Sequence, residues 1–229
     1  MKNLIFALLS AIVLAAPLDT PNQVTIEQSS HSGNGCPQGS VSSIISGDKT
    51  YITFGFDRFN AAIGPRANPN DKQKSCQLHL SLRYPQGFQV ALMTATYHGW
   101  VRLDSGVTAN FISSYYFSHA ASNTASSRTT LSGGEFKNGK SYTKEDKIEN
   151  AATVWSPCGA NGILNINNRI ALNSNNQQAQ GEISNDDATI KFEHKLLLQW
   201  RRCNQAKKDY VAHSDTFENA ELRSVMDSM

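Results

Sequence analysis

Paired carboxylates are the minimum catalytic equipment of most glycoside hydrolases, and the central part of this chain offers several candidates. Asp57 is the best single candidate for acid–base chemistry, because it stands between Phe56 and Arg58. A surface or turn carboxylate is the simpler interpretation of this residue. No Gly-X-Ser-X-Gly or phosphate-binding glycine motif follows a strand, so we assign no catalytic residue. The other available carboxylates are Asp104, Glu135, Asp146, Glu182 and Glu193.

Two histidines and one aspartate are the nearest approach to a metal site in the sequence. Two His and one Asp can bind a metal ion, and His98 and His119 would approach each other if segments 97–103 and 108–118 paired. Asp104 lies between them in the sequence. The spacing lacks a short His-X-His or His-X-X-X-His clamp. We therefore expect surface histidines beside a partly buried aromatic strand, with no metal and no cofactor.

Aromatic side chains offer a different chemistry, the stacking of sugar rings. Trp100 is the tryptophan that we would test first for ligand contact. Trp155 and Trp200 each lie close to a cysteine, and packing against a disulfide is their simpler role. The candidate ligand-binding residues are therefore Trp100, Tyr115, Tyr116, Asp57 and His98.

A polar strand face offers a further candidate surface. His79 shares the polar side of segment 76–84 with Gln77 and Arg83. A ligand groove would use such a face, although an ordinary solvated sheet face is the simpler interpretation.

The first residues are typical of a secretory signal peptide. Lys2 precedes the apolar run 4–14, which is far shorter than a bilayer-spanning helix, and Ala15 is a suitable cleavage position. An uncleaved anchor is the alternative. We expect a signal peptide over 1–15, a secreted domain over 16–203 and a polar C-terminal tail over 204–229, hence an extracellular protein that does not span a membrane.

Secretion decides how the cysteines are interpreted. The chain of 229 residues contains four, and an even number in an oxidising compartment predicts two disulfides. We favour Cys36–Cys76 and Cys158–Cys203, because each bond then closes a local half of the chain; the two other pairings stay open. A formal net charge of +2 excludes a strongly basic surface for nucleic acid.

Alternation with a period of two predicts many short strands. The segment 76–84 places Cys76, Leu78, Leu80 and Leu82 on one face, and a Pro-Gln-Gly turn at 85–87 then predicts a hairpin with 88–96. No long helical periodicity is present. These features predict an all-β fold, an antiparallel β-sandwich or jelly roll held by two disulfides.

Several motifs, taken in order, resemble a family of secreted four-cysteine proteins that is common in filamentous fungi and also found in bacteria. The resemblance covers roughly residues 30–203. It implies one secreted β-rich domain of unknown function and supplies no established catalytic residue. The motifs are Gly35–Ser40, Phe56–Phe59, Cys76–Leu78, Pro85–Phe88, Tyr97–Gly99, Tyr115–Ser118, Trp155–Gly159, Leu164–Asn167 and Leu198–Cys203.

Two functions are consistent with these features. The first is a non-catalytic binding or effector-like protein, a monomer that acts at the fungal cell wall or host interface and binds a wall glycan or a host component. The second is an extracellular polysaccharide-active enzyme with paired carboxylates. Asp57 facing Glu193 or Asp104 across a cleft would favour the enzyme.

Overall fold

Alternation of buried and exposed side chains builds the core of this protein. The computed structural model describes residues 20–149, 151, 154–159, 161–184 and 192–203. Within these ranges, β7 (Val107–Phe117) alternates buried with half-buried side chains along its whole length, and β12 (Phe192–Arg202) follows the same rule. Successive side chains of a strand point to opposite faces. Each strand therefore presents an apolar face to a second layer.

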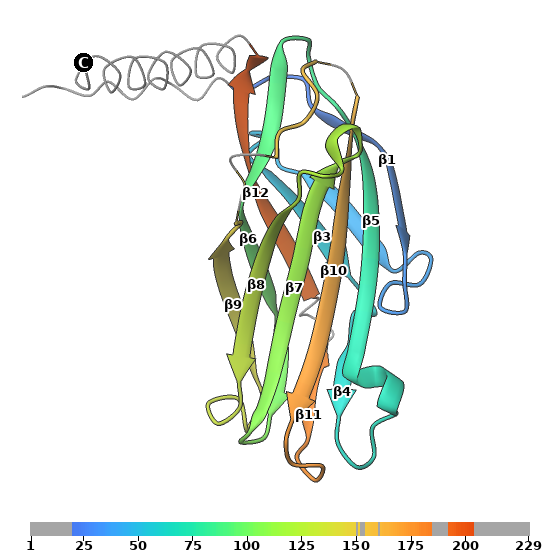
Figure 1. Ribbon diagram of the computed structural model, residues 1–229, viewed down its shortest axis with the longest axis vertical. Coiled ribbons are helices and arrows are strands. Elements are labelled where there is room, and N and C mark those ends of the chain that lie inside the picture. Colours follow the sequence, from blue (N-terminus) through green and yellow to red (C-terminus); the bar gives the residue numbers. More distant parts are fainter. Residues whose placement is uncertain (1–19, 150, 152–153, 160, 185–191, 204–229) are drawn as a thin grey trace, which may run out of the picture.

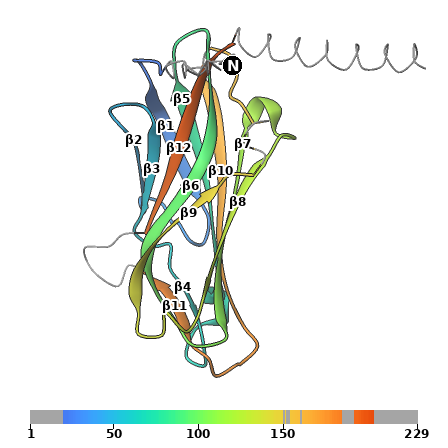
Figure 2. The ribbon, with the colours of Figure 1, turned by 90° about the vertical axis from the view of Figure 1, so that its left-hand side faces the viewer.

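Two antiparallel sheets pack face to face (Figures 1 and 2). The five-stranded sheet has the order β1-β5-β10-β7-β8, and the seven-stranded sheet has the order β2-β3-β12-β6-β11-β4, with β9 also paired to β6. The predicted all-β antiparallel sandwich is confirmed. The remaining elements are β1 (Thr25–Ser32), β2 (Val41–Ile45), β3 (Tyr51–Phe56), β4 (Ala61–Ile63), the 3-10 turn η1 (Pro69–Lys72), β5 (Gln73–Arg83), β6 (Phe88–Leu103), η2 (Ser118–Ala120), β8 (Ala125–Ser132), β9 (Lys140–Lys147), β10 (Gly162–Ser174) and β11 (Gly181–Ser184).

The hairpin predicted around residues 85–87 is wrong. β5 pairs with β1 and β10, whereas β6 pairs with β12, β9 and β11. The short turn therefore carries the chain from one sheet to the other. A turn of this length serves a hairpin or a corner equally well, and both strands bury one face in either arrangement, so local sequence cannot separate the two.

Aromatic rings fill one part of the space between the sheets. The ring of Phe192 lies 5.5 Å from Phe56, 5.4 Å from Phe59 and 5.7 Å from Phe111, measured between centroids. These side chains are almost completely buried. Burying each one contributes about 2–3 kcal/mol relative to exposure to water.

A chain of buried hydrogen bonds crosses the same interior. The Tyr97 hydroxyl lies 2.8 Å from the hydroxyls of Ser113 and Ser127. Tyr115 joins Ser127 at 2.8 Å and Nε2 of His194 at 3.0 Å. Tyr97 and His194 belong to the seven-stranded sheet and the other three belong to the five-stranded sheet, so these bonds tie the two layers together.

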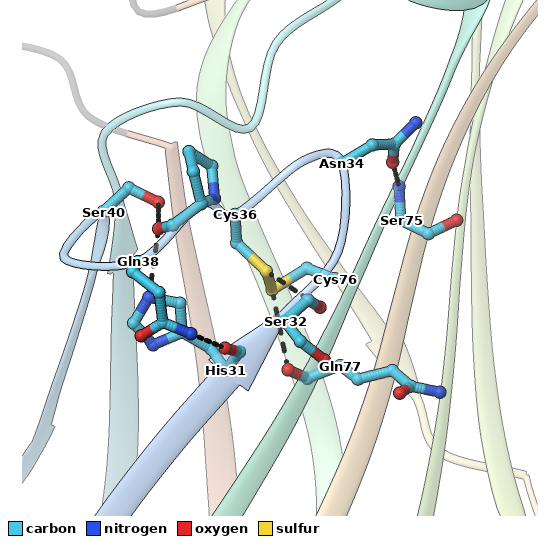
Figure 3. Close-up of a disulfide and its surroundings, with 10 residues drawn as sticks. His31, Ser32, Asn34, Cys36, Gln38, Ser40, Ser75, Cys76 and Gln77 are labelled. Atoms are coloured by element: carbon cyan, nitrogen blue, oxygen red, sulfur yellow. Dashed lines mark hydrogen bonds between the residues drawn. A yellow bond between two sulfur atoms is a disulfide. The ribbon is translucent and has the colours of Figure 1, made fainter.

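Both disulfides have the pairing that the sequence favoured. Cys36–Cys76 spans 40 residues and Cys158–Cys203 spans 45; by chain entropy each contributes roughly 4 kcal/mol. Figure 3 shows the first bond beneath the loop that follows β1, where the Asn34 side chain accepts from the Ser75 N–H at 2.8 Å. This disulfide therefore fixes the loop onto the start of β5.

The predicted signal peptide (1–15) and C-terminal tail (204–229) lie outside the described residues. Among the residues that are described, no helix has the length and apolar character needed to cross a membrane.

The two disulfides should differ in their resistance to reduction. Cys36 and Cys76 are 1% and 0% exposed, whereas Cys158 is exposed and Cys203 half-buried. Access governs thiol exchange, so mild reductant followed by alkylation of the folded protein should label Cys158 and Cys203 first. Peptide mass spectrometry checks this order. Simultaneous labelling of all four thiols without denaturant would contradict it.

Acid should destabilise the protein through His194. Complete burial lowers the pKa of His194 from 6.5 to about 3. Above pH 6.5 the imidazole is neutral in both the folded and the unfolded state. As the pH falls from 6.5 towards 3, the imidazole binds a proton in the unfolded chain but stays neutral in the folded chain. The loss of stability reaches roughly 5 kcal/mol at the lower end of this range.

Urea unfolding at a series of pH values, on wild type and His194→Gln, isolates this contribution from that of the carboxylates. The variant should be less stable at pH 7, because stacking on Tyr97 is lost, but its stability should fall less steeply with acid. If the free energies of unfolding of the two proteins fell in parallel with decreasing pH, His194 would not titrate in this way.

Candidate functional site

The predicted aromatic platform is divided between two faces of the sandwich. Tyr97 and Val101 of β6 point into the core, so Trp100 and His98 lie on the outer face of the seven-stranded sheet. Tyr116 lies on the outer face of the five-stranded sheet, because its neighbour Tyr115 is buried. The structure therefore does not bring Trp100 and Tyr116 together.

The prediction of Tyr115 as a ligand contact is wrong. Its side chain is 0% exposed, and its hydroxyl is bound to Ser127 and His194. Burial raises the pKa of Tyr115 well above 10, which keeps the phenol protonated. Adjacent residues of a strand face opposite ways, so Tyr115 and Tyr116 could not share one surface.

Trp100 packs against the protein itself. A Cβ added to Gly139 would lie 2.3 Å from Cζ2 of Trp100, so the indole rests on the backbone of the turn before β9. His98 Nδ1 lies 2.8 Å from the Thr143 hydroxyl of β9. Both side chains are half-buried on this outer face, which makes the Trp100–Gly139 contact structural.

The strand pairing that would have brought His98 close to His119 does not form. β6 and β7 lie in different sheets, because the turn at 104–106 passes between the layers. Within the described ranges, no group of three or more His, Cys, Asp or Glu side chains is placed to hold a metal ion.

Asp57, Glu193 and Asp104 are not among the described lining residues of the three hollows given below. It is exposed just after β3, and its N–H donates to the Ser40 carbonyl at 2.9 Å. Glu193 is exposed on β12, opposite Gly55. The Asp104 carboxylate accepts from the Gln180 N–H at 2.8 Å.

A small hollow of about 230 Å³ does contain two carboxylates, Asp71 and Glu182. Asp71 lies 2.8 Å from the Lys74 ammonium, and Glu182 lies 3.4 Å from the Arg102 guanidinium. Each carboxylate therefore has a cationic partner in this hollow.

On the polar face predicted on β5, His79 is hydrogen-bonded within the sheet. Nδ1 of His79 lies 2.6 Å from the Asn165 amide oxygen, and the Asn165 amide nitrogen donates to the Ser118 hydroxyl at 2.8 Å. Strand pairing also places Tyr116 opposite Asn165. His79, Asn165 and Tyr116 therefore lie in a row across three neighbouring strands.

A wide hollow lies at one end of the sandwich, where β1 begins, β5 ends and the turn from β2 to β3 lies. This end groove has a volume of about 1100 Å³, and a second hollow of about 410 Å³ adjoins it through Asn22, Gln23 and Pro85. The second hollow is also lined by Thr20, Pro21, Phe88 and Arg202. The end groove is lined by Asn22, Gln23, Val24, Thr25, Lys49, Arg83, Tyr84, Pro85, Gln86 and Asn161.

Three aromatic and aliphatic side chains support the end groove from below. Val24 and Tyr84 are buried, and the Tyr84 hydroxyl donates to the Pro157 carbonyl at 2.8 Å. The Tyr84 ring meets Trp200 edge-on at 5.7 Å. Trp200 in turn donates its indole N–H to the Lys49 carbonyl at 2.8 Å, which holds the Lys49 turn at the rim.

The chemistry of the end groove is that of amides and cations. Asn22, Gln23, Gln86 and Asn161 each offer a donor and an acceptor, while Lys49 and Arg83 add positive charge. None of the ten lining residues is Asp or Glu. Sequence reasoning missed this site, because its residues come from turns and strand ends whose sequences follow no common motif.

Comparisons with known proteins give a family without a stated activity. Residues 22–203 match the model of a family described as a domain of unknown function (DUF4360). An uncharacterized secreted protein of Arthroderma benhamiae is 39% identical over 183 residues, which cover 80% of this chain and 73% of that protein. The present chain is likewise a secreted protein with two disulfides.

Two solved structures with sandwich-like similarity were also found. TmCBM61 in complex with β-1,4-galactotriose is 12% identical, with a TM-score of 0.22, over 77% of this chain and 90% of that one. A family 11 carbohydrate-binding module from Clostridium thermocellum is 10% identical, with a TM-score of 0.24, over 76% and 90%. At TM-scores this low, the two likenesses carry no argument about ligand or activity.

The structural role of Trp100 leads to a prediction for Gly139. Gly139 and Gly134 have φ values of 74° and 98°, so alanine is strained at both, at a cost of about 1–2 kcal/mol. A Cβ at Gly134 meets nothing within 4 Å, whereas one at Gly139 overlaps the indole. Gly139→Ala should therefore lower the free energy of unfolding, measured in urea, by about 1–3 kcal/mol more than Gly134→Ala does. It should also alter the tryptophan emission. Equal losses with unchanged emission would contradict this packing.

Proposed function

The chain belongs to the DUF4360 family, and we propose that it is a non-catalytic binding protein that acts outside the cell. Its ligand is a hydroxyl-rich chain, a glycan of the cell wall or of a host surface, and the binding site is the end groove. The observation that carries this proposal is the described lining of the end groove, where side-chain amides combine with cations and no residue is Asp or Glu.

The absence of carboxylates from this lining favours binding over hydrolysis. Glycoside hydrolysis needs an acid and a second carboxylate on the two sides of the scissile bond. The end groove supplies neither from its ten lining residues. The described part of the lining therefore favours a ligand that is bound over one that is cleaved.

The amides suit sugar hydroxyls. A hydroxyl donates one hydrogen bond and accepts others, and an amide side chain offers both functions. The exposed side chains of Asn22, Gln23, Gln86 and Asn161 surround the hollow. Its volume of about 1100 Å³ is slightly above that of typical small-molecule sites, roughly 300–1,000 Å³, so a short oligosaccharide fits.

A glycan array followed by titration calorimetry tests this proposal. The double variant Gln23→Ala/Gln86→Ala should weaken binding of the best glycan roughly tenfold to a hundredfold, because two hydrogen bonds are lost. The matched control, Gln177→Ala/Gln178→Ala, removes two exposed glutamines from the β10–β11 turn and should bind normally.

Two results would overturn the proposal. Equal binding by the wild type and the groove variant would place the ligand elsewhere. Cleavage of a polysaccharide by the purified wild type would replace the binding function by the enzymatic one.

A further inference from the structure

Lys49 has an unusual backbone for its residue type. Its φ is 60°, and every other residue with positive φ in the described part of the chain is glycine. A side chain with a Cβ is strained in this left-handed region, where glycine or asparagine would be accommodated more easily. Such strain, observed at a residue that lines the end groove, points to a role for the side chain.

The turn that contains Lys49 is held without its side chain. The Ser46 hydroxyl accepts from the N–H groups of Thr50 and Tyr51 at 3.1 and 3.0 Å. The Lys49 N–H donates to the Ser46 carbonyl at 3.0 Å, and the Lys49 carbonyl accepts from Trp200. Main-chain groups and neighbouring side chains therefore fix this conformation, and a lysine is not needed to form it.

The adjacent carboxylate does not neutralise Lys49 through an ion pair. Asp48 instead accepts from the Ser46 hydroxyl and from the Thr50 N–H, which lowers its pKa to about 2. No ion pair within 4.0 Å joins the Lys49 ammonium to a carboxylate of the described residues. Lys49 thus lines the end groove without a carboxylate partner among the described residues.

A second cation faces the same space. Arg83 lies in an exposed pair with Glu27, with 3.2 Å between nitrogen and oxygen and an Arg83 side chain that is 71% exposed. A solvent-exposed pair of this kind is weak and exchanges readily. Arg202, whose guanidinium lies over the Phe88 ring at 4.7 Å, lines the adjoining hollow. Lys49, Arg83 and Arg202 therefore line two adjoining hollows at one end of the sandwich, with Glu27 and Asp48 beside two of them.

We infer that the ligand of the end groove is an acidic polysaccharide, whose carboxylate or sulfate group is bound by Lys49 and Arg83. This inference rests on the proposed function and adds the charge of the ligand to it. Three observations favour an anion in this position: Lys49 has no ion pair with a described carboxylate, its backbone is strained, and no described lining residue is Asp or Glu.

Lys49→Gly is the decisive variant, because it removes the ammonium and relieves the backbone strain that the positive φ imposes on a residue with a Cβ. Its melting temperature should equal or exceed that of wild type, while its affinity for short polygalacturonate or short sulfated dextran chains falls at least tenfold. Lys49→Asn, which also tolerates positive φ, should behave in the same way without adding a flexible glycine. Lys49→Arg should keep most of the affinity. The matched control is Lys137→Gly, an exposed lysine in the turn before β9.

The two anionic probes and neutral dextran separate the possible results. Binding of polygalacturonate alone assigns a carboxylate ligand, and binding of sulfated dextran alone assigns a sulfate ligand; either supports the inference if Lys49→Gly abolishes it and salt weakens it. A different result would overturn the inference and leave the proposed function standing. In that case neutral dextran binds as well as both anionic probes, Lys49→Gly does not change its binding, and Gln23→Ala/Gln86→Ala abolishes its binding. Failure of the wild type to bind either anionic probe would also overturn it.

Discussion

The buried hydrogen bonds between the two sheets are the interaction on which the rest of this structure depends. Apolar faces attract without direction, so they bring the sheets together but specify poorly how one lies on the other. Tyr97 and His194 reach from one sheet to Ser113, Ser127 and Tyr115 of the other. A shift of either sheet would leave these groups buried and unpaired, which is costly. The polar interior thus sets the alignment of the sandwich.

The end groove follows from that alignment, because its walls come from both layers. Lys49 belongs to the β2–β3 turn of the seven-stranded sheet, Arg83 ends β5 of the five-stranded sheet, and Gln86 lies in the crossing between them. Trp200 and Tyr84 meet beneath the groove and join the two sides. The Cys158–Cys203 bond holds the neighbouring chain segments at the same end. Rigid support of this kind keeps exposed amides and cations in position for a ligand.

Particular residues show how far the sequence led. The period of two in 76–84 was sufficient to identify β5 and its buried face, and local closure was sufficient to favour the observed disulfides. The same period of two places the adjacent residues Tyr115 and Tyr116 on opposite faces of their strand. The prediction that both contact one ligand was wrong because it did not apply this alternation. The hairpin at 85–87 failed for a different reason, because a corner between sheets and a hairpin within one have the same local pattern. The sequence favoured Trp100 as the tryptophan to test first for ligand contact, but its packing against Gly139 depends on the tertiary fold.

By itself, the sequence determined which residues alternate between core and surface, that the four cysteines would pair, and to which family the chain belongs. These properties depend on local periodicity, on composition and on motif order. The tertiary structure decided which strands share a sheet, where the positive charges gather and which side chains surround the end groove. The hydrogen bond from Trp200 to Lys49 joins residues 151 positions apart, and a contact of that range has no local signature. A small net charge likewise averages over the whole chain, whereas a binding site depends on where the individual charges lie.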